Sequence, residues 1–303
     1  MEHCEIFIVG AGAAGMAAAV SAWNAGCRSI LLADRGQGPG GVLSQCLHHG
    51  FGLAAFGREL TGPDYAHRLA GSLEGTGVQV LYDTEVFSVK ADRTALLSSR
   101  RGVTELRFDR LILAAGCREK AIGSLPVAGT RPAGIFTAGQ AQELINLRRQ
   151  DIGDNILILG SGDLGMIMAR RLVLEGKKVV AVLEQNESYG GMARNYRRCI
   201  EQYRIPLLCR RTVTEIFGEG RICGVTVEHL DSGAQEYVPC GTLVTALGLI
   251  PDRELVRSLG QRDWLWLAGN CDRVYALADS AVAQAAEAGR QAAEGWPFPG
   301  RLM

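Results

Sequence analysis

A glycine-rich segment between two apolar stretches near the N-terminus limits the fold of this chain most strongly. Residues 6–9 are apolar and rich in β-branched side chains, as in a buried parallel strand. A G-x-G-x-x-G motif follows at 10–15, then an alanine-rich stretch typical of a helix, and a second apolar strand at 29–32 that leads to Asp34. The three glycines allow a tight turn, the approach of a pyrophosphate and close helix packing, and the acid can accept from ribose hydroxyls. The segment therefore predicts a dinucleotide-binding unit, although glycine clusters also mark ordinary turns.

The same pattern occurs a second time in the middle of the chain. Residues 155–184 repeat the apolar strand, the motif GSGDLG at 160–165, a helical stretch and a second strand that ends at Glu184. The acid stands at the same distance from the first glycine in both copies. Such internal repetition predicts two nucleotide-binding halves, and therefore two bound dinucleotides.

Each half continues with a predicted β-meander and a strand that ends in small residues. The first meander is expected at 85–90, 95–99 and 104–108, with a separate core strand at 111–114. The second is expected at 212–217, 222–229 and 234–238, with a core strand at 242–247. A helix at 192–203 carries Arg194, Arg197 and Arg198, which form either a solvated face or a contact to a cofactor phosphate or an acidic partner.

The C-terminal block has no counterpart in the second half. It contains a strand at 265–267, the sequence Ala268-Gly269-Asn270 and an alanine-rich helix at 279–295. We expect it to complete the first half, with the N-terminal end of the helix facing the first nucleotide. A plain packed helix fits its alanine content equally well.

Composition excludes several functional classes. Lysine plus arginine equals aspartate plus glutamate at 32 each in 303 residues, so no basic field favours nucleic acid. No apolar run is long enough to span a membrane, and a cytoplasmic location is expected. The nine cysteines contain no C-x-x-C, which argues against a zinc site and a redox disulfide, so no metal is expected.

Cys46 and His48 stand together in a glycine-rich stretch after the first unit. One interpretation is a thiolate or imidazole that acts on a substrate beside a cofactor. The other is a packed cysteine next to polar loop residues. Cys46 and His48 are kept as the candidate catalytic residues.

The order of motifs resembles the two-dinucleotide-binding FAD/NAD(P) oxidoreductases of the thioredoxin reductase type, or pyridine nucleotide-disulfide oxidoreductases. The resemblance rests on GAGAAG, the doublet Gly40-Gly41, LAAG, GSGDLG, TALGLIPD and LAGN. The stretches GGVLSQCLHHGFG, ELTGPDYAHR and PAGIFTAGQAQELIN are closer to subunits that accompany anaerobic glycerol-3-phosphate dehydrogenase and the opine, sarcosine and cyanide-forming dehydrogenases. The missing C-x-x-C means that disulfide reduction is not implied.

This resemblance implies an α/β fold of two Rossmann-like domains, each a parallel sheet with helices and a three-stranded β-meander. Residues 1–119 and 249–303 would form a discontinuous FAD-binding domain, and residues 120–248 an NAD(P)-binding domain. The implied FAD contacts are Gly10, Gly12, Ala14, Gly15, Asp34, Arg35, Gly41, Val42, Val86, Ala115, Gly116, Gly269 and Asn270. The implied nicotinamide-cofactor contacts are Gly160, Gly162, Asp163, Leu164, Gly165, Glu184 and Gly248. Asn270 replaces the aspartate of many relatives, and its amide can still bond a hydroxyl.

The expected function is a relay of hydride or electrons between NAD(H) and a partner dehydrogenase or small acceptor through bound FAD. Glu184 favours NAD(H) over NADP(H), because a carboxylate repels a 2′-phosphate, and Gln185 and Asn186 add no positive charge. One alternative is a self-contained NADH oxidase or quinone-type reductase. Another is a non-catalytic nucleotide-binding subunit of a dehydrogenase complex. A homo- or hetero-oligomer fits each of these.

Overall fold

The computed structural model describes residues 2–295, which divide into two compact units. Unit 1 comprises residues up to 118 and from 250 onward, and unit 2 comprises residues 119–249. The chain passes between them twice, at β9 (Cys117–Glu119) and β19 (Leu249–Pro251). None of the helices in the described part of the chain is both long and apolar enough to cross a membrane.

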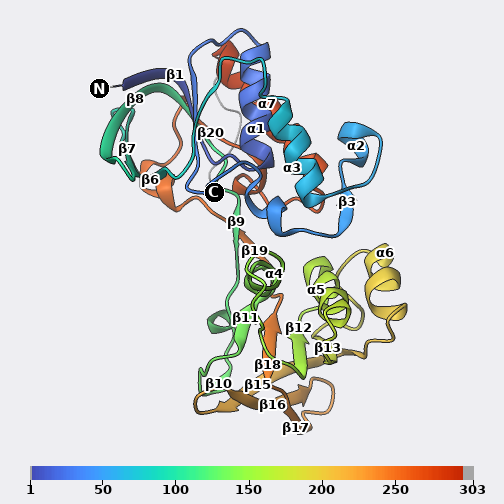
Figure 1. The fold of residues 1–303 in the computed structure, drawn as a ribbon. Coiled ribbons are helices and arrows are strands. Elements are labelled where there is room, and N and C mark those ends of the chain that lie inside the picture. The colour runs from blue at the N-terminus through green and yellow to red at the C-terminus, as the bar shows by residue number, and fades with distance from the viewer. Residues whose placement is uncertain (1, 296–303) are drawn as a thin grey trace. The chain divides into compact units, whose positions relative to one another are not determined.

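Unit 1 is built on a seven-stranded sheet in the order β5-β2-β1-β8-β7-β6, with β20 also paired to β8 (Figure 1). Its central strands are parallel, because β1 pairs in parallel with both β2 and β8. The strands are β1 (Glu2–Val9), β2 (Ile30–Ala33), β5 (Gln79–Leu81), β6 (Glu85–Val89), β7 (Thr94–Ser99), β8 (Gly102–Leu113) and β20 (Leu265–Leu267).

Strand β8 differs from the sequence-based prediction. We predicted a meander strand at 104–108 and a separate core strand at 111–114, whereas Gly102–Leu113 forms one strand. Its first half pairs antiparallel with β7 and is largely exposed, and its second half pairs in parallel with β1 and is buried. One strand therefore serves both the meander and the parallel core.

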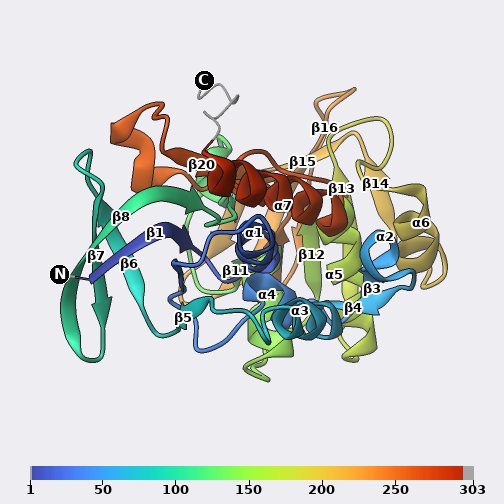
Figure 2. The same ribbon diagram turned by 90° about the horizontal axis from the view of Figure 1, so that it is seen from above.

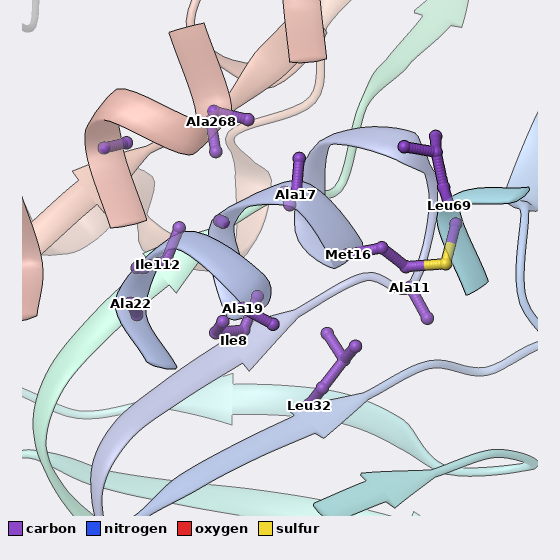
Figure 3. Packing of buried hydrophobic residues seen from close by; sticks show 14 of the residues in the cluster. Ile8, Ala11, Met16, Ala17, Ala19, Ala22, Leu32, Leu69, Ile112 and Ala268 are labelled. Atoms are coloured by element: carbon purple, nitrogen blue, oxygen red, sulfur yellow. The ribbon is translucent and has the colours of Figure 1, made fainter. Parts of the chain in front are cut away.

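Three helices cover one face of this sheet, and α1 and α7 lie side by side (Figures 1 and 2). They pack closely because both carry small residues at the contact. Gly289 faces the backbone of Ala18, where a Cβ would lie 2.1 Å from the carbonyl oxygen. In Figure 3, Ala19 lies beside Ile8 of β1. The three covering helices are α1 (Ala13–Asn24), α3 (Gly62–Gly71) and α7 (Ala278–Glu294). A short hairpin of β3 (His49–Phe51) and β4 (Leu60–Thr61) lies beside them, with α2 (Leu53–Phe56) between its strands.

Unit 2 repeats this plan with a five-stranded parallel sheet in the order β11-β18-β12-β13-β14. Its strands are β11 (Ile135–Thr137), β12 (Ile156–Leu159), β13 (Val179–Glu184), β14 (Leu207–Cys209) and β18 (Thr242–Thr245). A second sheet in the order β10-β15-β16-β17 contains the predicted meander. These strands are β10 (Ala128–Gly129), β15 (Arg211–Gly218), β16 (Ile222–His229) and β17 (Gln235–Pro239).

The helices of unit 2 are α4 (Ala138–Asn146), α5 (Asp163–Leu174) and α6 (Ala193–Asn195). Helix α4 begins with a capping box between Thr137 and Gln140. The predicted helix at 192–203 is only partly correct, because α6 is a single turn that continues as a π-helical turn over Tyr196–Glu201.

Candidate functional site

The loop between β1 and α1 contains two glycines that the fold of unit 1 requires. Gly10 has a φ of +106°, and a Cβ there would lie 2.5 Å from the carbonyl oxygen of Ala114. A Cβ on Gly15 would lie 1.7 Å from the carbonyl oxygen of Gly10. Helix α1 can therefore approach the ends of β1 and β8 only because both positions lack a side chain.

Gly12, the middle glycine of the motif, is not required by the packing of the described residues. Its φ of −72° suits any residue. A Cβ there would meet no described atom within 4 Å. Gly12 is the N-cap of α1, where backbone N–H groups lack helical partners and the helix dipole is positive. A pyrophosphate matches this open, electropositive space.

The carboxylate of Asp34 lies beside the same loop and retains capacity for a ligand. One oxygen accepts from the N–H of Ala11 and the other from the N–H of Gly36, each at 2.6 Å. A carboxylate accepts up to about four hydrogen bonds. Two acceptor positions therefore remain, which suits the diol of a ribose.

Two further glycine segments meet at this loop. The N–H of Gly40 donates to the carbonyl oxygen of Ala11 at 2.9 Å, and a Cβ on Gly41 would lie 3.4 Å from the Cα of Gly12. Gly269 arrives from the C-terminal segment, where a Cβ would lie 2.5 Å from that of Ala14. Residues distant in sequence thus meet at the start of α1.

The structure places the predicted residues of unit 1 in two groups. Those around the loop are Gly10, Gly12, Ala14, Gly15, Asp34, Gly41, Ala115 and Gly269. Gly116 lies at the turn before β9, with a φ of +77°. Asn270 is held in place, since its Oδ1 accepts from the N–H of Tyr275 at 3.0 Å. Arg35 and Val42 are exposed. Val86 lies on β6, where it packs at the edge of the hydrophobic core that contains Phe7 and Phe108.

The surroundings of Cys46 favour the packing interpretation over the thiolate. Its side chain is buried, and the thiol donates to the carbonyl oxygen of Val42 at 3.3 Å. Burial raises the pKa of Cys46 to about 12, so the thiol is protonated at neutral pH. His48 packs its ring against Phe51, with ring centroids 5.1 Å apart.

Asp279, in the first turn of α7, was not singled out by the sequence. Its carboxylate accepts from the N–H of Gly52 at 3.1 Å and from the N–H of Ala54 at 2.8 Å. The start of α2, a few residues after His48, is therefore fixed to the N-terminal end of α7. Asp279 is one of three acids in an alanine-rich helix, and nothing in the sequence distinguishes it from the other two.

The loop between β12 and α5 in unit 2 repeats the glycine geometry. Gly160 has a φ of +109°, and a Cβ there would lie 2.3 Å from the carbonyl oxygen of Ala246. A Cβ on Gly165 would lie 2.1 Å from the carbonyl oxygen of Gly160. Gly162 again has an ordinary φ of −58°, and a Cβ on it would meet no described atom within 4 Å. The space at the N-terminus of α5 suits a second pyrophosphate.

Glu184 lies beside this loop but is more enclosed than Asp34. Its Oε2 accepts from the N–H of Ser161 at 3.1 Å and from the Ser161 hydroxyl at 2.5 Å. Its Oε1 accepts from the N–H of Asn186 at 2.9 Å and from the Asn186 amide at 2.7 Å. Burial alone would raise the pKa of Glu184, but the hydrogen bonds from Ser161 and Asn186 outweigh it and lower the pKa. The acid is therefore ionised at neutral pH.

The doublet Gly190-Gly191 belongs to this site and was missed. The N–H of Gly190 donates to the hydroxyl of Ser161 at 2.9 Å, and a Cβ on Gly191 would lie 2.7 Å from the backbone nitrogen of Asp163. A signal was present in the sequence, because the doublet stands at the same distance from Glu184 as Gly40-Gly41 does from Asp34.

Three other predicted residues of unit 2 have roles within the protein. The Asp163 carboxylate accepts from the N–H of Met192 and from the side-chain amide of Asn195, each at 2.7 Å. Leu164 packs at the edge of the core, and Gly248 has a φ of +102° at the turn after β18. Asp163 thus ties the segment after the doublet to the start of α5.

A family model described as pyridine nucleotide-disulphide oxidoreductase matches residues 4–292. Hydrogen cyanide synthase subunit HcnB of Pseudomonas aeruginosa is 29% identical over 280 residues, which cover 84% of this chain and 58% of that protein. An opine oxidase subunit of Agrobacterium tumefaciens is 26% identical over 283 residues, which cover 86% of this chain and 55% of that protein. The chain thus spans little more than half the length of these curated relatives.

Among solved structures, the thioredoxin reductase of T. acidophilum superposes with a TM-score of 0.75 at 21% identity. The superposition covers 97% of this chain and 98% of that one. It confirms the predicted fold class of two Rossmann-like domains. The nine cysteines, all of which lie within residues 2–295, form no disulfide.

Proposed function

Since the chain belongs to the pyridine nucleotide-disulphide oxidoreductase family, we propose that it relays electrons between NAD(H) and a partner dehydrogenase or small acceptor through FAD. Membership makes it an FAD-containing, NAD(P)H-linked oxidoreductase. The finer proposal assigns FAD to unit 1 and the nicotinamide cofactor to unit 2, with domain boundaries near 119 and 249.

The repeated middle glycine carries this proposal. Gly12 and Gly162 have ordinary backbone angles and open space where a side chain would be, whereas the glycines around them are required by contacts within the fold. A glycine that the packing does not need indicates that something else must approach the backbone. At the N-terminus of a helix, the matching group is a phosphate.

In unit 1, the residues that would hold FAD supply two kinds of contact. The start of α1 offers N–H donors to the pyrophosphate, and Asp34 offers acceptors to the ribose. Small residues at the end of β8, together with Gly269 and Asn270, would border the rest of the cofactor. Bound FAD supplies hydride and single-electron transfer, which amino-acid side chains do not provide.

Glu184 supports NAD(H) as the second cofactor. Its lowered pKa keeps a negative charge where the adenosine ribose would lie. That charge attracts hydroxyl donors and repels a 2′-phosphate. Gln185 and Asn186 next to it are neutral.

The relatives support a partner. The two curated relatives are by name subunits of larger enzymes. The chain has no C-x-x-C that would transfer electrons to a disulfide. We therefore favour a partner dehydrogenase over a self-contained oxidase or quinone-type reductase, and over a non-catalytic role in a complex.

Anaerobic mixing of the FAD-loaded chain with NADH or NADPH tests this function. We expect NADH to reduce the flavin at least about tenfold faster at low concentration, because repulsion of the 2′-phosphate costs about 1–4 kcal/mol. Stopped-flow absorbance of the flavin gives both rates. Faster reduction by NADPH would contradict the assignment of Glu184, and rapid turnover with oxygen or a quinone would favour the self-contained enzyme.

A further inference from the structure

The two acids beside the glycine loops differ in how many hydrogen bonds they already accept. Asp34 accepts two, both from backbone N–H groups, whereas Glu184 accepts four. Because a carboxylate has about four acceptor positions, those of Glu184 are all used within the protein. A ribose diol can bond to Asp34 directly, but at Glu184 it must replace donors that are already present.

We propose that the Ser161 hydroxyl and the Asn186 amide occupy the ribose-diol position of unit 2, and that a nicotinamide nucleotide binds only by displacing them. The proposal rests on the function above, in which Glu184 faces the adenosine ribose. In this proposal the side chains of Ser161 and Asn186 take the place of the ribose hydroxyls. Their competition with the ribose lowers the affinity of unit 2 for its nucleotide.

Comparison of the two units supports these two side chains as the displaceable donors. The backbone donors are equivalent, because Ala11 and Ser161 follow the first glycine and Gly36 and Asn186 stand two residues after the acid. Unit 1 has alanine and glycine at these positions and offers no side-chain donor there. Unit 2 has a hydroxyl and an amide, and each bonds to the acid.

The surroundings allow the displacement. Asn186 is exposed, so its amide can turn to water with the backbone bond kept. The Ser161 hydroxyl is fully buried and also accepts from the N–H of Gly190, so its side chain leaves Glu184 by rotating as a whole and releasing that N–H. Through Ser161 the acid is linked to the Gly190-Gly191 doublet, and displacement at Glu184 would therefore reach the segment above α5.

Titration of the FAD-loaded full chain with NAD⁺ in a calorimeter tests the proposal. Asn186→Ala and Ser161→Ala each remove one competing donor and leave the backbone donors, so each should tighten NAD⁺ binding about threefold to tenfold. The double variant should tighten it by about the product of the two factors. If Ser161→Ala disturbs the segment at Gly190, the Asn186→Ala variant by itself still tests the proposal.

Gln185→Ala is the matched control, because Gln185 is an exposed neighbour whose side chain makes no hydrogen bond among residues 2–295. Its NAD⁺ affinity should stay within about twofold of wild type. Unchanged or weaker binding by Asn186→Ala, with NAD⁺ still bound by wild type, would overturn the displacement and leave the proposed function intact. Folded protein that binds no NAD⁺ in any variant would overturn both.

Hydrogen exchange gives a second readout that does not depend on turnover. The backbone N–H groups of Ser161 and Asn186 bond to Glu184, and under the proposal they keep these bonds when a nucleotide binds. Their protection against hydrogen exchange should therefore persist when NAD⁺ is added, while the exchange rate of the Gly190 backbone N–H should change. Loss of protection at Ser161 and Asn186 would show that the backbone donors are displaced instead, which would contradict the proposal.

Discussion

Gly12→Ala should strongly weaken flavin binding while the chain still folds. The added Cβ contacts no described atom of the protein, so it fills the space at the start of α1 that the pyrophosphate requires. A clash of this kind costs about 1–3 kcal/mol, which weakens FAD binding by up to about a hundredfold. The flavin-free chain should change in unfolding free energy by only about 1 kcal/mol, because the loss of a favourable N-cap and the lower backbone entropy of alanine oppose each other.

FAD affinity measured by flavin fluorescence, with urea unfolding of the flavin-free protein, checks this result. Gly162→Ala is the matched control, because it makes the same change in unit 2 and should leave FAD affinity at the wild-type value. Equal flavin binding by Gly12→Ala and wild type would show that no phosphate lies at this loop.

Gly289→Val should strongly destabilise unit 1. A Cβ at this position would lie 2.1 Å from the carbonyl oxygen and 2.8 Å from the carbonyl carbon of Ala18, and a backbone cannot move aside as a side chain can. Helices α1 and α7 would have to separate, and the packing of both against the sheet would loosen. We expect a loss of about 3 kcal/mol or more in unfolding free energy and weaker flavin retention.

The release of flavin fluorescence on heating reports this loss, with an expected fall in midpoint of about 6–12 °C. Gly71→Ala is a suitable control, because Gly71 lies at the exposed end of α3 and a Cβ there meets no described atom within 4 Å. It should shift the midpoint by about 2 °C or less. A shift that small for Gly289→Val would mean that α1 and α7 do not pack as closely as described.

Features that depend on local order were predictable from the sequence. The strand–glycine loop–helix–strand pattern occurs twice, and each part of it is encoded by neighbouring residues. The fold class followed from that repeat and is confirmed by the thioredoxin reductase structure. The continuity of β8 was not predictable, because its two halves differ in burial and read as separate strands.

The candidate site was less accessible to sequence reasoning, because its details depend on contacts across the fold. Cysteine beside histidine suggested reactivity, yet burial raises the pKa of Cys46 to about 12. The sequence identified Glu184 as the counterpart of Asp34 but not that Ser161 and Asn186 fill its acceptor positions. Of the contacts that sequence reasoning missed, the Gly190-Gly191 doublet had a readable signal, namely its spacing from Glu184.

Anaerobic titration of wild type and Gly162→Ala with NADH tests most directly whether the chain pairs a flavin in unit 1 with a nicotinamide cofactor in unit 2. In wild type, NADH should bleach the visible absorbance of the bound flavin. The Gly162→Ala variant should retain its flavin and still be bleached by dithionite, but should respond to low NADH up to about a hundredfold more slowly. Reduction of that variant by NADH at the wild-type rate would contradict the account.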